Sequence, residues 1–64
     1  MRLLDIGNSE NCIFIDLSKL LSLKYYKDTR KIAWTMEGGT IYTTGPFSRE
    51  DLEDILEEIN DEGN

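Results

Sequence analysis

The side chains of this 64-residue chain that could take part in chemistry are mostly carboxylates. The sequence has 13 Asp or Glu and no His, so it lacks the commonest general base and metal ligand of proteins. The single Cys12 has neither a His nor a second Cys with which to form a nucleophilic or metal-binding pair. We therefore expect no catalytic, cofactor-binding or metal-binding residues, and a protein that is not an enzyme.

Most of the acidity lies in the last quarter of the chain. Residues 48–64 hold eight Asp or Glu and only Arg49, a net charge of −7, whereas residues 1–47 hold six Lys or Arg and five Asp or Glu, a net charge of +1. The excess of carboxylates disfavours binding to nucleic acid or to an anionic membrane. Their spacing indicates one exposed helix face, which is either a solvated surface or a patch that recognises a basic partner or imitates a phosphate backbone. The candidate acidic face consists of Glu50, Glu53, Asp54 and Glu57.

A second group of residues combines aromatic rings with lysines on strand-like segments. We expect these side chains on the sheet face opposite the helix, where three interpretations stay open. The face could form a homodimer, stack the bases of single-stranded nucleic acid, or bind nothing. A chain this short buries only a small core, which favours self-association. The candidate interaction face consists of Phe14, Lys24, Tyr26, Lys31 and Tyr42.

The elements that position these residues are organised around residues 31–44, where two β-prone runs flank Gly38-Gly39. A Gly-Gly pair tolerates the positive φ angles of a two-residue hairpin turn. Such a turn pairs Trp34 with Thr43 and leaves Tyr42 on the polar face. The apolar face then consists of Ile32, Trp34, Met36, Ile41 and Thr43.

A third strand over residues 21–27 precedes this hairpin. A turn centred on Asp28 and Thr29 pairs Leu23 with Trp34 and Tyr25 with Ile32. The two turns therefore agree on which side of the sheet faces the core, which supports both registers.

The N-terminal part of the chain predicts two further strands, over residues 2–6 and 12–17, with turn residues between them. Asp16 and the residues after it indicate a corner or a single helical turn, because Asp and Ser side chains bond their own backbone. We expect Cys12 to be a small buried side chain in a reducing cytosol. No long apolar run is present, so we expect neither a signal peptide nor a membrane span, and a cytoplasmic location.

The clearest helix signal covers residues 48–60. Ser48 is the expected N-cap, with Asp51 at the third helical position and Phe47 and Leu52 placed as a hydrophobic staple. Residues 61–64 are expected to fray. One apolar stripe runs along the helix through Leu52, Ile55, Leu56 and Ile59.

Three runs follow one another across residues 12–59: CIFIDLSKLLSLKYY, KIAWTMEGGTIYTT and FSREDLEDILEEI. Together they resemble the small FlbD/SwrD-type bacterial proteins associated with flagella. The resemblance implies a strand that ends in a corner, then a hairpin and a short helix. The chain departs from that family where MRLLDIGNSEN replaces the leading L-T-R-L-N-G and where KDTRK replaces the central P-D-T. We therefore transfer no functional residue from it.

The sequence thus predicts one α+β domain over residues 1–64, in which residues 1–47 form an antiparallel β-meander of four or five strands. One C-terminal amphipathic helix packs on the Trp34 face. The expected function is that of a small non-enzymatic interaction or regulatory module, a homodimer with an unknown protein partner. The alternatives are an acidic inhibitor, encoded by a phage or its host, that imitates nucleic acid, and a protein that binds single-stranded nucleic acid.

Overall fold

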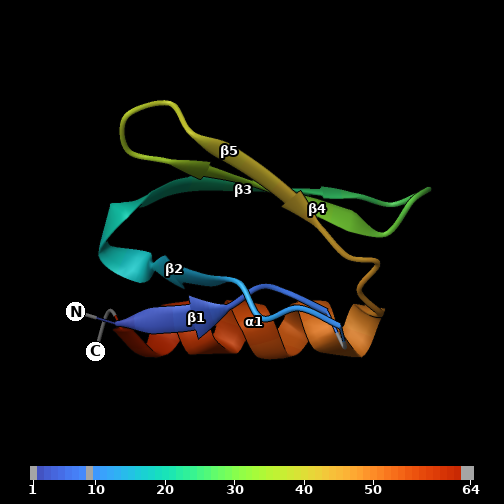
Figure 1. Cartoon of the computed structure of the whole chain (residues 1–64). Coiled ribbons are helices and arrows are strands. Elements are labelled where there is room, and N and C mark those ends of the chain that lie inside the picture. Colours follow the sequence, from blue (N-terminus) through green and yellow to red (C-terminus); the bar gives the residue numbers. More distant parts are fainter. Residues whose placement is uncertain (1, 9, 63–64) are drawn as a thin grey trace.

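The structure is a computed structural model that describes residues 2–8 and 10–62, without the side chains of residues 61 and 62. It confirms the α+β class (Figure 1), but its five strands form two antiparallel sheets rather than one meander. The smaller sheet pairs β1 (Leu3–Asp5) with β2 (Phe14–Asp16). The larger sheet has the order β3 (Leu20–Tyr26), β4 (Lys31–Met36), β5 (Ile41–Thr44), and the helix α1 spans Arg49–Glu62.

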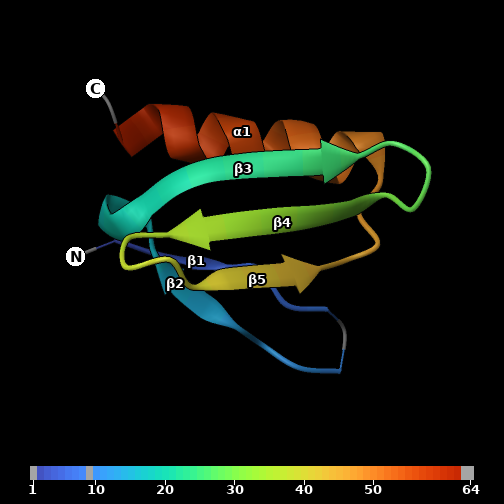
Figure 2. The ribbon, with the colours of Figure 1, turned by 90° about the horizontal axis from the view of Figure 1, so that it is seen from above.

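The elements form two layers. The three-stranded sheet is the upper layer of Figure 1, and α1 and the β1–β2 hairpin lie side by side below it. Seen from above in Figure 2, α1 runs along the β3 edge and the hairpin lies on the β5 side. The inner face of the sheet is therefore covered by two elements, and not by the helix alone as the sequence predicted. A helix of about 10 Å diameter is too narrow to cover three strands.

The chain passes between the layers at the predicted corner. Leu17–Lys19 form one turn of 3-10 helix, which Asp16 caps. Asp16 Oδ1 accepts hydrogen bonds from Ser18 N at 3.0 Å and from Ser18 Oγ at 2.7 Å. This turn redirects the chain out of the plane of β2, so that β2 and β3 do not pair and the single predicted sheet divides into two.

The core lies between the layers and centres on Trp34, which is fully buried as predicted. Its indole Nε1 donates a hydrogen bond to Thr44 Oγ1 at 2.8 Å, and its ring meets the Phe47 ring edge-on with centroids 6.5 Å apart. The buried residues come from both layers: Ile6, Ile15, Leu17, Ile32, Trp34, Met36 and Ile55.

The register of β3 against β4 is as predicted, with Leu23 opposite Trp34 and Tyr25 opposite Ile32. The strand begins one residue earlier than expected and ends at Tyr26. A bulge at Leu21 shifts the pairing at its start, and the extra residue is 66% exposed.

The register of β4 against β5 differs by one residue from the prediction. Met36 N donates to Thr40 O at 2.8 Å and Gly39 N donates to Met36 O at 3.0 Å, so the loop has three residues, Glu37–Gly39, instead of two. Trp34 consequently faces Tyr42 and not Thr43. Because side chains alternate between faces, a shift of one residue moves every β5 side chain to the opposite side of the sheet.

The helix begins as predicted, with a reciprocal capping box. Asp51 N donates to Ser48 Oγ at 3.1 Å, and Ser48 N donates to Asp51 Oδ2 at 3.2 Å. It ends later than expected, at Glu62, so that residues 61 and 62 are helical, while the predicted fraying of residues 63 and 64 lies outside the described residues. Of the predicted stripe, Leu52, Ile55 and Ile59 contact the core, whereas Leu56 is 43% exposed.

The N-terminal strands are shorter than predicted, because the chain between them forms a wider loop. Asp5 Oδ1 accepts hydrogen bonds from Gly7 N and Ile13 N, which holds the two arms of the loop together. Cys12 lies in this loop, ahead of β2, and is exposed, so the expectation of a buried thiol was wrong. The only α-helix of residues 2–8 and 10–62, α1, falls short of the length and apolar character that crossing a membrane requires.

Candidate functional site

The outer face of the three-stranded sheet carries three of the five residues predicted as an interaction face. Lys24 lies opposite Ala33, and Tyr26 lies opposite Lys31, all on the side away from Trp34. Lys24 Nζ lies 5.1 Å from the centroid of the Tyr26 ring, a cation–π distance. Lys24, Tyr26 and Lys31 therefore form one small basic and aromatic patch.

The other two residues of that prediction lie elsewhere. Tyr42 shares the inner face with Trp34, because the three-residue loop reverses β5. Phe14 belongs to the separate β1–β2 sheet and is 59% exposed, on the face that also carries Leu3 and is opposite the buried Ile15. The structure thus leaves one aromatic ring, not three, on the predicted face. Successive bases need successive rings to stack on, so the nucleic-acid alternative loses its geometric support.

The predicted acidic face of α1 is exposed throughout. Its members recur at helical spacing and lie on the side of α1 opposite the core. Two other carboxylates of the helix have partners: Asp51 caps the helix, and Glu58 Oε1 lies 3.3 Å from Arg2 Nη2. Within residues 2–8 and 10–60, no ion pair involves the four residues of the acidic face, Glu50, Glu53, Asp54 and Glu57.

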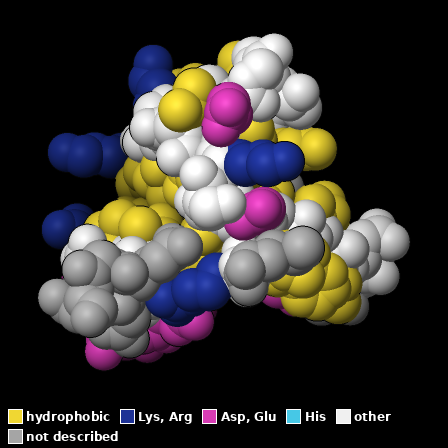
Figure 3. All heavy atoms as spheres, turned by 90° about the vertical axis from the view of Figure 1, so that its left-hand side faces the viewer, with side chains coloured by type: hydrophobic (Ala, Val, Ile, Leu, Met, Phe, Trp, Pro, Cys, Tyr) yellow, Lys and Arg dark blue, Asp and Glu magenta, His cyan; other side chains and the backbone are white. Residues whose placement is uncertain are grey.

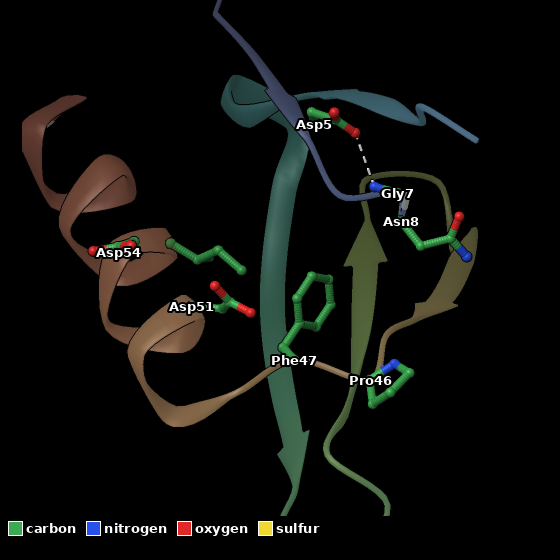
Figure 4. Close-up of a pocket in the computed structure, with 8 residues that line it drawn as sticks. Asp5, Gly7, Asn8, Pro46, Phe47, Asp51 and Asp54 are labelled. Carbon is green, nitrogen blue, oxygen red and sulfur yellow. Dashed lines mark hydrogen bonds between the residues drawn. The ribbon is translucent and has the colours of Figure 1, made fainter. Parts of the chain in front are cut away.

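A cavity of about 550 Å³ lies between the β1 end of the hairpin and the start of α1 (Figure 4). Phe47, Pro46 and Ile55 give it an apolar wall, and Asp5, Asp51 and Asp54 line it as well. Two of these carboxylates already accept backbone hydrogen bonds, and Figure 4 shows that the three do not converge on one point. In the part of the chain that the structure describes, no three His, Cys, Asp or Glu residues are grouped closely enough to hold a metal ion.

A second groove, about 250 Å³, separates β3 from α1. Tyr25 and Lys27 line it from the strand side, and Arg49, Leu52, Glu53 and Leu56 from the helix. Sequence reasoning missed this groove, because its two cations are far apart in the sequence and only the topology brings them together. The one available signal was Arg49, the single basic residue of a strongly acidic helix.

The free edges of the larger sheet differ in charge. The β3 edge carries Lys24 and has Lys27 directly after it, whereas β5, Ile41–Thr44, contains no charged residue. Bonding residues alternate along an antiparallel strand, and Thr40 bonds β4, so Ile41 and Thr43 direct their N–H and C=O groups toward the free edge. Ile41 is 61% exposed. The absence of charge in this run was readable from the sequence but gained meaning only once β5 was placed at an edge.

Comparisons with known proteins add no relative: no family model matches the chain, and neither the curated proteins nor the solved structures contain a match. The resemblance to flagellar proteins accordingly stays a prediction.

Proposed function

We propose that this chain is a non-enzymatic protein–protein interaction module of the cytoplasm that forms a homodimer by pairing β5 with β5 of a second copy. The uncovered and uncharged edge of β5 is the observation that carries the proposal. An edge strand presents unpaired backbone groups, and natural proteins usually protect such edges with charges, prolines or covering elements. The exposed Cys12 fits a reducing compartment, in which a thiol does not form an intermolecular disulfide.

The charge distribution supports a second copy as the occupant of this edge. The chain carries a net charge of −6, and most of that charge is on α1. Figure 2 places α1 along the β3 edge, on the opposite side of the sheet from β5. Two copies joined through β5 therefore keep their acidic helices at the two far ends of a six-stranded sheet, where screening by salt makes their repulsion small.

The exposed surface also supports association. The chain exposes 4710 Å² at a mass of 7.4 kDa. A folded monomer of that mass exposes about 4,200 Å². Exposed apolar surface lies on β5, where Ile41 and Tyr42 are 61% and 40% exposed. In a dimer, these side chains would be buried beside the hydrogen bonds that join the two β5 strands, and they would add an apolar contact.

Sedimentation equilibrium tests the dimer with a matched pair of variants. Ile41→Lys places a charge at the proposed contact, and Leu21→Lys makes the same change at an equally exposed aliphatic residue on β3. We expect the wild type and Leu21→Lys to dimerise alike and Ile41→Lys to dissociate at least tenfold more readily. A wild-type monomer at about 1 mM, where even an association of about 4 kcal/mol is detected, contradicts the proposal. Equal weakening of the dimer by Ile41→Lys and Leu21→Lys also contradicts the proposal.

The exposed carboxylates of α1 favour a second candidate function, recognition of a basic protein surface. Triple neutralisation of Glu50, Asp54 and Glu57 to the amides tests it, with Glu10→Gln and Glu37→Gln, exposed residues off the helix, as the control. An immobilised lysine- and arginine-rich peptide serves as the probe. We expect affinity that falls steeply with salt and is lost only in the triple variant. Salt-independent binding would count against this candidate.

A further inference from the structure

The groove between β3 and α1 has the form of a site for an added strand. Its walls are the free edge of the larger sheet and one side of a helix that runs beside that edge (Figure 2). Figure 3, which views the molecule from the left-hand side of Figure 1, shows hydrophobic side chains at the surface beside projecting Lys and Arg side chains. The volume of about 250 Å³ is ample for one apolar side chain.

The backbone of β3 offers unpaired groups along this groove. Arg30 N donates to Tyr26 O at 2.7 Å and Tyr26 lies opposite Lys31, so Tyr26 and Lys24 direct their backbone groups toward β4. Leu23 and Tyr25 alternate with them and direct their N–H and C=O groups toward the free edge. The same two residues turn their side chains to the inner face, above α1. A strand that bonds their backbone groups therefore places every second side chain over the helix.

The two cations of the groove lie at the same end. Lys27 follows the last residue of β3 and Arg49 is the first residue of α1, so both cations lie where the turn after β3 meets the start of the helix. Glu53 lines the groove too, yet no ion pair within 4.0 Å involves Lys27 or Arg49 among the described residues. Two unpaired cations next to an apolar floor made by Leu52 and Leu56 fit a ligand that combines an acidic and an apolar group.

We propose that this groove binds an extended peptide segment as a fourth strand on β3, with an apolar side chain between Tyr25 and Leu56. An acidic residue two positions along the segment lies beside Lys27 and Arg49. The main-chain bonds supply affinity, and the alternate side chains supply selectivity, as in other cases of strand addition. The site is on the opposite edge of the sheet from β5, so peptide binding and the proposed dimer do not compete. Either proposal can therefore be refuted without the other.

Two blocked heptapeptides test the site. Both consist of threonine with a central valine and one glutamate, which stands two residues before the valine in one peptide and two residues after it in the other. Since the orientation of the added strand is open, only one of the two needs to bind. The readout is the backbone amide spectrum of the full chain. We expect the amides of Leu23 and Tyr25 to shift and to exchange with solvent more slowly, because their N–H groups acquire acceptors.

Charge reversal provides the specificity test. In the double variant Lys27→Glu and Arg49→Glu, we expect the affinity for the glutamate peptide to fall at least tenfold and that for a peptide with lysine in place of glutamate to rise. The double variant Lys24→Glu and Lys31→Glu, on the outer face, makes the same change in net charge, and as the matched control it leaves both affinities unchanged. Leu56→Ala weakens binding without loss of the fold, because Leu56 is already 43% exposed.

Three results overturn the proposal. The first is no change at Leu23 or Tyr25 with either glutamate peptide at millimolar concentration. The second is binding that the double charge reversal leaves intact. The third is a set of shifts confined to Ile41 and Thr43, which would move strand addition to the β5 edge.

Discussion

Replacement of Thr44 by Val tests the observed register of the central hairpin most directly. Thr44 Oγ1 accepts the hydrogen bond of the Trp34 indole N–H at 2.8 Å, and Trp34 is fully buried. Valine has nearly the shape of threonine but no acceptor, so the variant leaves a buried donor without a partner. In the predicted two-residue turn, Thr43 would have occupied the Trp34 face instead.

An unsatisfied buried donor costs about 1–3 kcal/mol of folding free energy. A core of this size supplies about 3–5 kcal/mol in total, so the variant loses a large share of it. With an m-value of about 1 kcal/mol per M of urea, the midpoint of unfolding should fall by about 1–3 M. The fluorescence of Trp34, the single tryptophan, reports the transition.

Two further variants make this result specific to the register. Thr44→Ser keeps the hydroxyl and should recover most of the lost stability, while Thr43→Val, at an exposed position, should change the midpoint little. If Thr43→Val destabilises the protein as much as Thr44→Val, or if Thr44→Val has no effect, the three-residue loop and the faces assigned to β5 are wrong.

Three other substitutions test local features. Ser48→Ala removes the capping-box acceptor of α1 and should cost about 1 kcal/mol, measured by urea unfolding, and an unchanged midpoint would show that the cap contributes nothing. The Ser18 hydroxyl and backbone N–H hold the pKa of Asp16 below its ordinary value. These hydrogen bonds therefore stabilise the folded protein fully at pH values above the ordinary pKa, and this stabilisation is lost as the pH falls through the lower pKa of the folded state. Ser18→Ala should therefore raise the pKa of Asp16 in a carboxyl NMR titration, and a pKa that stays in place would exclude the hydroxyl as the main cause. Gly7→Ala should cost about 1–3 kcal/mol in thermal unfolding, because its Cβ would collide with Asn11 O, and an unaltered melting temperature would mean that the loop relaxes freely.

The sequence predicted best those features that depend on neighbouring residues. The capping box at Ser48, the corner after Asp16 and the register across the turn at Asp28 all follow from short-range hydrogen bonding or turn chemistry. The burial of Trp34 followed from apolar alternation along β4. The first three depend on contacts between residues close together in the chain, whereas Trp34 is buried by distant residues and only the pattern that predicts its burial is local.

The errors concern features that short-range rules leave open. Gly38 and Gly39 have positive φ angles of 95° and 91°. Because glycine accepts positive φ angles in turns of either length, two glycines in succession allow both a two- and a three-residue loop. The division into two sheets depends on how the 3-10 turn directs the chain in space. Both errors changed the predicted interaction face. Phe14 lies in the other sheet and Tyr42 lies on the inner face, so neither is on the face that Lys24 and Tyr26 share.

The Glu37–Gly39 loop also bears on how this chain can change during evolution. A deletion of one codon there leaves β5 on the same face only if a two-residue turn keeps Met36 opposite Thr40. If the loop keeps three residues, Thr35 closes it and β5 is inverted, which sends Tyr42 and Thr44 to the outer face and brings Ile41 and Thr43 against the core. Most surface loops tolerate such small insertions and deletions. Here a deletion that shifts the register would act like four simultaneous substitutions, so we expect purifying selection against those changes in loop length that invert β5.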